Sequence, residues 1–234
     1  MARKLIIILF ISLLTGQGGI AQENDPFSAC IDLGEEIIIE KLESENSGEI
    51  CGRTAGVINA PLHIVWSVLS DYNRFYEFMP RMPVTYLVDK AAARMIAMKD
   101  KWKRKELEHW LEEFRTESIE GDTVYFYNVV DMPVPVEDRW YLLKMVRDSI
   151  NYQVHWTMVI GNMEINRGSW KIKAHPADSR KTLAVYTTCS DSGIPIPRFI
   201  QNYGLKKSLP DIINGVRERS FECAKDLAQN AFRR

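Results

Sequence analysis

Apolar and polar residues alternate along several segments in the second half of the chain. From Tyr152 to Ile160 every second residue is apolar, and the residues between them include Gln153, His155 and Thr157. Successive side chains of a strand point to opposite faces, so this pattern predicts a strand with one apolar face. Segments of similar composition predict further strands at 123–130, 139–146, 169–174 and 182–189. We therefore expect an antiparallel sheet that is covered on one side only.

Elsewhere the apolar residues follow the period of a helix. Two short helices are expected after Pro61 and before Pro80, behind an N-terminal hairpin at 36–59. Within 91–115, an amphipathic helix is predicted by Leu107, Trp110, Leu111 and Phe114. The longest stripe lies near the C-terminus, at Leu209, Ile212, Ile213, Val216, Ser220, Cys223 and Leu227. The pattern predicts an α+β fold in which a long C-terminal helix covers the sheet.

The first 21 residues have the three-part order of a secretory signal peptide. Arg3 and Lys4 precede an apolar run at 5–14, which only Ser12 interrupts, and a small, Gly-rich segment at 15–21. The apolar run is short for a membrane-spanning helix, which needs about 20 residues. An uncleaved anchor is the alternative. We expect a signal peptide at 1–21, an extension at 22–34 and one domain at 35–234, in a protein that is exported to the periplasm or secreted.

Charge and cysteine content narrow the function classes. The chain has 30 Lys and Arg against 31 Asp and Glu, so there is no global basic field and nucleic acid is not an expected partner. Cys30, Cys51, Cys189 and Cys223 permit two disulfides in three pairings in an oxidising compartment. They show no metal-ligand spacing, and we expect neither a metal nor a cofactor.

Several motifs carry a family resemblance. The segment 65–72 (VWSVLSDY), which continues to Phe78-Met79-Pro80, resembles the helix pair of the START-like superfamily, also called SRPBCC, which includes polyketide cyclase-like and coenzyme Q-binding proteins. The segment 132–139 (MPVPVEDR) resembles the Pro-rich turn and Asp-Arg pair of its bacterial members. The segments 168–170, 194–197 and 208–210 are similar to its last strands and final helix. The resemblance spans roughly residues 35–230, and the segment 91–115 is an insertion relative to it.

The resemblance implies a helix-grip fold, with a curved antiparallel sheet of about seven strands around the C-terminal helix. In that superfamily a cavity between sheet and helix usually holds a lipid, sterol, quinone or other apolar molecule. Packing in an ordinary core is the alternative for aromatic residues on these elements. The candidate ligand-binding residues are Tyr125, Tyr127, Arg139, Trp140, Trp156, Met158, Trp170, Ile213 and Val216.

Arg139 is the most informative charge, because it begins an otherwise apolar strand. Its guanidinium could project inward and bind a carboxylate or phosphate head group. The alternative is an ion pair at the surface or rim with Glu137 or Asp138.

The insertion contains a basic cluster around an aromatic residue, formed by Lys99, Lys101, Trp102, Lys103, Arg104 and Lys105. Such a cluster can dock on anionic lipid, as a lid and membrane sensor beside the cavity mouth. A solvated helix face is the alternative, since Glu106, Glu108, Glu112 and Glu113 follow closely.

The sequence contains no catalytic motif of the common hydrolase, P-loop or zinc-protease kinds. His63, His109, His155 and His175 lie far apart on different elements. We therefore expect a protein that binds or transfers a hydrophobic small molecule, with a lipid as the leading kind. Two alternatives stay open. One is a cyclase- or hydratase-like enzyme that uses His155 or Tyr152 in the same cavity, and the other is a protein-interaction module with a collapsed cavity.

Overall fold

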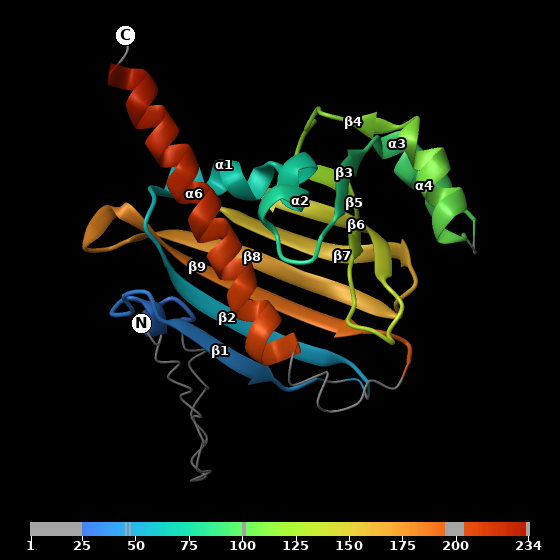
Figure 1. The fold of residues 1–234 in the computed structure, drawn as a ribbon, viewed down its shortest axis with the longest axis horizontal. Helices are drawn as coiled ribbons and strands as arrows, with labels where there is room; N and C mark the ends of the chain where they lie inside the picture. Colours follow the sequence, from blue (N-terminus) through green and yellow to red (C-terminus); the bar gives the residue numbers. More distant parts are fainter. Residues whose placement is uncertain (1–24, 45, 47, 100–101, 195–203, 233–234) are drawn as a thin grey trace.

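One curved antiparallel sheet forms the body of the protein (Figure 1). The computed structural model describes residues 25–44, 46, 48–99, 102–194 and 204–232. The expected signal peptide at 1–21 lies outside the described residues. In the described part, nine strands pair in the order β1-β2-β9-β8-β7-β6-β5-β3-β4. They are β1 (Ile37–Leu42), β2 (Ile50–Ile58), β3 (Val84–Val88), β4 (Arg115–Thr116), β5 (Thr123–Val130), β6 (Arg139–Asp148), β7 (Gln153–Gly161), β8 (Ile165–His175) and β9 (Asp178–Asp191).

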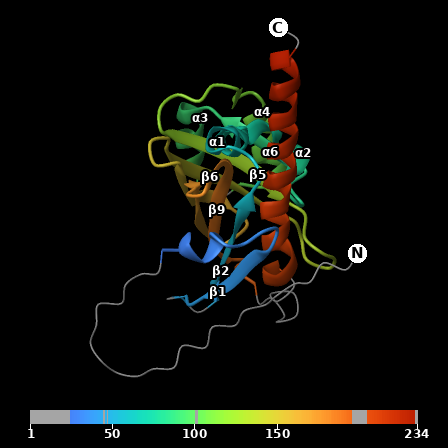
Figure 2. The same ribbon diagram turned by 90° about the vertical axis from the view of Figure 1, so that its left-hand side faces the viewer.

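The helices lie on both sides of this sheet. Figure 2 shows α6 on one side and α3 on the other. On the side of α6 are α1 (Leu62–Ser70), α2 (Phe75–Phe78) and α6 itself (Leu209–Phe232). The insertion forms α3 (Lys90–Ala97) and α4 (Arg104–Glu112). Shorter helical turns are η1 (Ser28–Cys30), η2 (Tyr72–Arg74) and η3 (Gly204–Ser208).

Strand alternation gives the sheet two apolar faces. On β5 and β6, one set of residues packs with α1, α2 and α6 on the inner face, including Phe126, Tyr141 and Leu143. The intervening residues Tyr127 and Trp140 pack on the outer face, in a second cluster with the insertion. A third cluster, around Cys30, Ala55, Val57, Leu183 and Val185, places the N-terminal segment over the outer face of β2 and β9.

The helix-grip prediction is therefore confirmed, with three corrections. The sheet has nine described strands rather than about seven, and one of them is the two-residue β4, which pairs with β3. The sheet is covered on both sides rather than one, because the insertion and the N-terminal segment bury its outer face. The described part of the insertion forms two helices rather than one. Asp89 caps the N-terminus of α3, because its side chain accepts hydrogen bonds from the backbone amides of Ala91 and Ala92.

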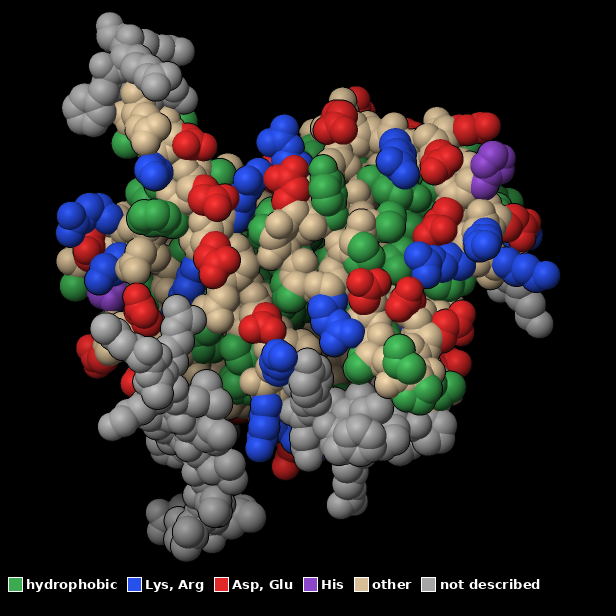
Figure 3. Space-filling view, viewed as in Figure 1, with side chains coloured by type: hydrophobic (Ala, Val, Ile, Leu, Met, Phe, Trp, Pro, Cys, Tyr) green, Lys and Arg blue, Asp and Glu red, His purple; other side chains and the backbone are tan. Residues whose placement is uncertain are grey.

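Two of the four cysteines form a disulfide in the described protein. Cys51 and Cys189 lie opposite each other on β2 and β9 and form a disulfide. Cys30 and Cys223 are free thiols. No helix of the described residues has both the length and the apolar character needed to cross a membrane. Cationic and anionic side chains are interspersed on the face that carries α6 (Figure 3), which agrees with the net charge of −1.

Candidate functional site: a cavity between the sheet and the helices

A cavity of about 820 Å³ lies between the inner face of the sheet, α2 and the first turns of α6. Phe75 and Met79 contribute from α2 and its end, and Leu209 and Ile212 contribute from α6. The sheet contributes most of the wall, with Phe126, Asn128, Arg139, Tyr141, Leu143, Met145, Trp156, Asn166, Trp170 and Tyr186. Its volume falls within the range of about 300–1,000 Å³ that is usual for small-molecule sites.

The pairing of β5 with β6 fixes the order of the wall residues. Val130 lies opposite Arg139, Asn128 opposite Tyr141, Phe126 opposite Leu143, and Val124 opposite Met145. The polar residues therefore occupy one end of the two strands and the apolar residues the other. Loop residues border the cavity at the polar end, namely Arg81, Met82, Met132, Met163, Glu164, Ser192 and Gly193.

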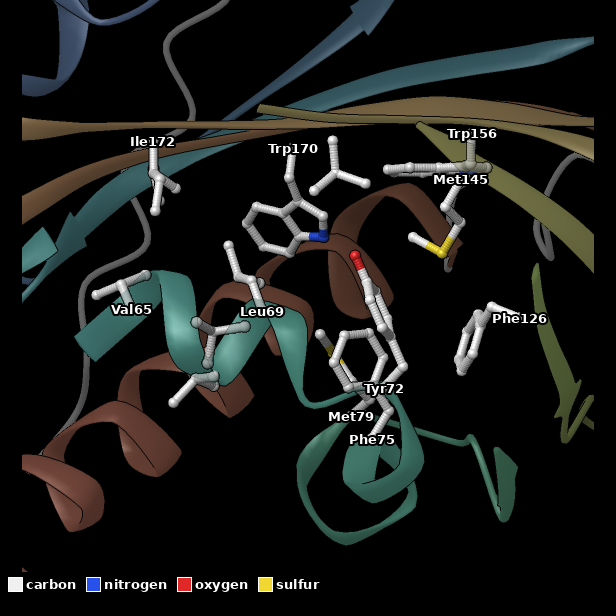
Figure 4. Packing of buried hydrophobic residues seen from close by; sticks show 14 of the residues in the cluster. Val65, Leu69, Tyr72, Phe75, Met79, Phe126, Met145, Trp156, Trp170 and Ile172 are labelled. Carbon is white, nitrogen blue, oxygen red and sulfur yellow. The ribbon is translucent and has the colours of Figure 1, made fainter. Parts of the chain in front are cut away.

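Aromatic rings form the wall on β7, β8 and β9. The rings of Trp156 and Tyr186 stack with centroids 5.4 Å apart, and those of Trp170 and Tyr186 are 4.8 Å apart. Figure 4 shows the Trp170 ring projecting from the sheet toward Tyr72, the Trp156 ring lying flat along the sheet, and Phe75 and Met79 on the side of the helices. The rings of Trp156, Trp170 and Tyr186 together form an apolar part of the cavity wall on the side that faces the helices.

Gly168 makes room for the Trp156 ring. The two residues lie opposite each other on β8 and β7. A Cβ at Gly168 would be 2.3 Å from Cζ2 of that ring. Trp156 is held at its other end as well, because its Nε1 donates a hydrogen bond to Oδ1 of Asn166 at 3.1 Å. The indole is therefore fixed in the cavity wall by both neighbours.

Two polar side chains in the wall are buried without partners. Arg139 is 5% exposed, and its Nε and Nη2 have no hydrogen-bond partner among the described residues. Asn128 is 1% exposed, and within the same part of the chain neither its Oδ1 nor its Nδ2 is bonded. The expected ion pair of Arg139 with Glu137 or Asp138 does not form. Asp138 instead pairs with Arg104 of α4 at 3.3 Å.

Two tyrosines of the wall stay protonated over the physiological range. Burial raises the pKa of Tyr186 to about 12, and burial likewise raises the pKa of Tyr141 well above its ordinary value. The side chain of Asn166, which lies near the Tyr141 hydroxyl, partly opposes that shift. Both hydroxyls are therefore neutral groups near the polar end of the cavity.

The structure divides the predicted site residues into three groups. Arg139, Trp156 and Trp170 line the cavity. Met158, Ile213 and Val216 pack in the inner core without lining it. Tyr125, Tyr127 and Trp140 lie on the outer face, in the cluster with α3 and α4. Their expected inward placement was wrong because the insertion provides a second apolar layer, so an aromatic residue on β5 or β6 can be buried on either side.

The prediction missed most of the inner wall of β5 and β6. Phe126 and Asn128 alternate with the predicted Tyr125 and Tyr127 on β5. On β6, Tyr141, Leu143 and Met145 share the face of Arg139. The alternation of side chains along β6, counted from Arg139, would have identified these residues. Every second residue after it on β6 shares its face, which would have assigned Tyr141 and Leu143 to the cavity and Trp140 to the other side.

The basic cluster of the insertion lies on the outer side of the sheet, away from the cavity. Lys99 lies over the Trp102 ring, 3.9 Å from its centroid, and pairs with Glu106. Arg104 pairs with Glu108 at 3.0 Å. Lys103 and Lys105 are exposed, and Lys101 lies outside the described residues. The insertion therefore does not cover the cavity as a lid.

No histidine appears in the cavity wall that the structure describes. His155 is exposed on β7, and Tyr152 packs edge-on against Trp66 outside the wall. The residues suggested for an enzyme reaction are thus not brought into the cavity. Glu49, Cys51 and Cys189 lie close together, but both sulfurs belong to the disulfide and are not available to a metal.

Among known proteins, similarity to this chain is found only with solved structures. No family model and no curated protein matches the sequence. Among solved structures, the fold matches a STAR-related lipid transfer protein (fragment 25-204) from Xanthomonas axonopodis, with a TM-score of 0.56, 16% identity, and coverage of 79% of this chain and 93% of that one. The chain has a START-like fold.

Two further structures share the START-like fold. A protein from Thermus thermophilus matches with a TM-score of 0.53 and 13% identity, over 74% of this chain and 97% of that one. The Zhui aromatase/cyclase from Streptomyces sp. R1128 matches with a TM-score of 0.51 and 13% identity, over 74% of this chain and 93% of that one. At these identities the likeness establishes the START-like fold and not a shared activity.

Proposed function

We propose that this protein binds a hydrophobic small molecule, a lipid above all, in the cavity between its sheet and α6. The observation that carries the proposal is the cavity of about 820 Å³ and the largely apolar character of its wall. Burying apolar surface is favourable by about 25 cal/mol per Å², so a hydrocarbon chain in such a site needs no catalytic group to bind. One structural neighbour is a lipid transfer protein, which supports a ligand of this class.

The experiment compares two positions on β9 that differ only in the face they occupy. Thr188 lines the cavity, and it lies between Gly52 of β2 and Gly168 of β8. Thr187, its neighbour, is directed to the opposite face. Thr188→Trp should fill the cavity, whereas Thr187→Trp adds the same indole outside it. Circular dichroism and thermal unfolding check that both variants fold.

The probe is the neutral fluorophore N-phenyl-1-naphthylamine. We expect saturable binding with a blue-shifted emission for the wild type and for Thr187→Trp, and a loss of about tenfold or more in affinity for Thr188→Trp. Native mass spectrometry of protein purified from its own host should show a co-purified small molecule in the first two proteins. Absence of probe binding to the wild type, or equal binding to all three, would refute the proposal.

We also propose that the protein acts after export, in the periplasm or outside the cell. The order of residues 1–21 supports this, as does the Cys51–Cys189 disulfide, because such bonds persist in oxidising compartments. Mass measurement of the mature protein tests it, since cleavage after residue 21 would leave Gln22 at the N-terminus. Membrane contact through the basic cluster of the insertion stays a prediction.

A further inference from the structure

Arg139 presents an unused cationic group to the cavity. Its guanidinium belongs to a residue that is 5% exposed and lines the wall, and Nε and Nη2 are unbonded. Buried charges in proteins are normally paired or fully hydrogen-bonded, because desolvating a charge without a partner is costly. Among the described residues, no carboxylate lies within ion-pair distance of Arg139. Within the described part of the chain, Nε and Nη2 of the guanidinium are thus donors without an acceptor.

The carboxylates nearest to it in the chain and in the wall do not compensate its charge. Asp138 pairs with Arg104, and its other oxygen accepts a hydrogen bond from the backbone amide of Met132 at 3.2 Å. Glu164 and Asp191 line the cavity at its loop end, but neither forms an ion pair with Arg139. The charge of Asp138 is therefore compensated by Arg104, whereas the charge of Arg139 faces the cavity without an ion pair among the described residues.

Asn128 provides a second unused polar group beside it. Asn128 lies one inward position along β5 from Val130, which is the partner of Arg139 across the sheet. Both side chains point inward, and side chains in this diagonal relationship are close neighbours on one face of a sheet. Neither polar atom of the Asn128 amide, nor Nε and Nη2 of Arg139, is bonded to any residue that the structure describes. Together these groups form a polar corner in a largely apolar space.

The rest of the wall orients a ligand with respect to this corner. Beyond Asn128 and Tyr141, the cross-strand pair Phe126 and Leu143 is apolar, followed by Val124 and Met145. A molecule with one charged end would place that end at Arg139, next to the bordering loops. Its hydrocarbon part would then extend along the apolar pairs toward Trp156 and Trp170.

We propose that the ligand is an amphiphile with one anionic group, a carboxylate or a phosphate monoester, bound by Arg139 with Asn128 as a second donor. This inference rests on the proposed function and specifies the class of molecule that the same cavity takes. Arginine suits this role because its planar fork of donors matches the geometry of both anions.

The test uses three probes with the same chain: dodecanoate, dodecyl phosphate and dodecanol. Each displaces N-phenyl-1-naphthylamine from the wild type at neutral pH, below its micelle concentration. We expect at least one anion to displace the fluorophore at a concentration about tenfold or more below that of dodecanol, since hydrogen bonds to charged groups are the strong ones. The order of dodecanoate and dodecyl phosphate identifies which anion the site prefers.

Arg139→Met removes the charge while keeping a long side chain, and it should abolish the preference for the anion while leaving dodecanol displacement unchanged or improved. Arg139→Lys keeps a point charge without the fork, and an intermediate preference is expected. The matched control is Arg180→Met. Arg180 lies on β9 outside the cavity wall and pairs with Asp178 at 3.0 Å, so this variant should keep the wild-type preference.

The results separate this inference from the proposed function. If the fluorophore binds and Thr188→Trp blocks it, but all three probes displace it equally, the cavity binds apolar molecules and the anionic class is wrong. Such a result would mean that only water solvates Arg139. If Arg139→Met keeps the preference, or if Arg180→Met removes it as well, the assignment to Arg139 is wrong. If the fluorophore does not bind the wild type, the proposed function itself fails.

Discussion

The backbone oxygen of Phe78 lies against Gly215 so closely that a Cβ on this glycine would be 2.3 Å from it. Phe78 ends α2 and Gly215 lies on α6, so the contact sets how near these two helices approach. Because α2 and the start of α6 both border the cavity, their separation also defines one side of it.

Gly215→Ala should therefore destabilise the protein, by about 1–3 kcal/mol, because the added methyl group overpacks a backbone contact. Alanine at an unconstrained helical position would instead stabilise the helix by about 1 kcal/mol relative to glycine. Urea unfolding monitored by circular dichroism decides between these signs. Asp226→Ala, on an exposed position of the same helix, is the control and should change stability by less than about 0.5 kcal/mol. A stabilised Gly215→Ala variant would contradict the close approach.

Tyr127→Phe tests the assignment of this residue to the outer face. The Tyr127 hydroxyl donates a hydrogen bond to Oε1 of Glu108 on α4 at 3.0 Å. Its loss should lower the free energy of unfolding by about 1–2 kcal/mol, because the acceptor is charged. Binding of N-phenyl-1-naphthylamine should not change. Tyr125→Phe is the matched control, since within the described structure the Tyr125 hydroxyl has no hydrogen bond. A Tyr127→Phe variant with altered probe affinity would place Tyr127 in contact with the cavity.

The disulfide gives a third prediction. Replacing Cys51 and Cys189 together by serine should lower the free energy of unfolding by about 2–5 kcal/mol, since the bridge joins residues separated by 138 positions. Cys223→Ser should have little effect, because this thiol is free and only partly buried. Peptide mapping without reduction should recover Cys51 joined to Cys189. Any peptide that joins Cys30 to Cys223 would contradict the structure.

Glu49 gives a prediction about acid stability. Its side chain is 0% exposed and pairs with Arg167 at 2.9 Å. Hydrogen bonds from Arg167 and then Ser44 hold the pKa of this carboxyl below its ordinary value. A folded-state pKa below that of the unfolded chain means that the ionised carboxylate adds stability above about pH 4.3, the ordinary value for glutamate. This contribution is lost as the pH falls through the folded-state pKa.

Glu49→Gln should therefore be less stable than the wild type at pH 7, and the difference should shrink as the pH falls toward the folded-state pKa. Urea unfolding across that pH range measures both trends. Glu40→Gln is the control, since Glu40 lies in an exposed ion pair with Arg53 at 3.3 Å. A constant difference at every pH would show that Glu49 acts through packing rather than through its charge.

The fold could be predicted from sequence wherever the pattern was local. The strand predicted at 123–130 coincides with β5. The alternation in 152–160 and the stripe at the C-terminus placed β7 and α6 correctly. In each case a regular period, ended by turn residues, was sufficient. The two-residue β4 has no such period, because it is a strand only through its pairing with β3.

The site was harder to predict because it depends on which layer covers each face. Tyr127 and Trp140 are as apolar as Phe126 and Tyr141, and only the contact with α3 and α4 decides that the first two face outward. That contact joins elements far apart in the sequence, so no local pattern of residues predicts it. The role of Arg139 was left open between two interpretations for the same reason, since the pairing of Asp138 with Arg104 depends on where α4 docks.

Arg139 and Trp140 are adjacent in the chain, yet one faces the cavity and the other the core of the insertion. Alternate side chains of β6 face these two sides of the sheet. Adding or deleting a single residue within β6 would therefore turn the following side chains to the opposite side. An indole would then fill the binding space, and a guanidinium would be forced among packed apolar side chains. Changes of chain length in this protein should therefore be confined to the connections between strands.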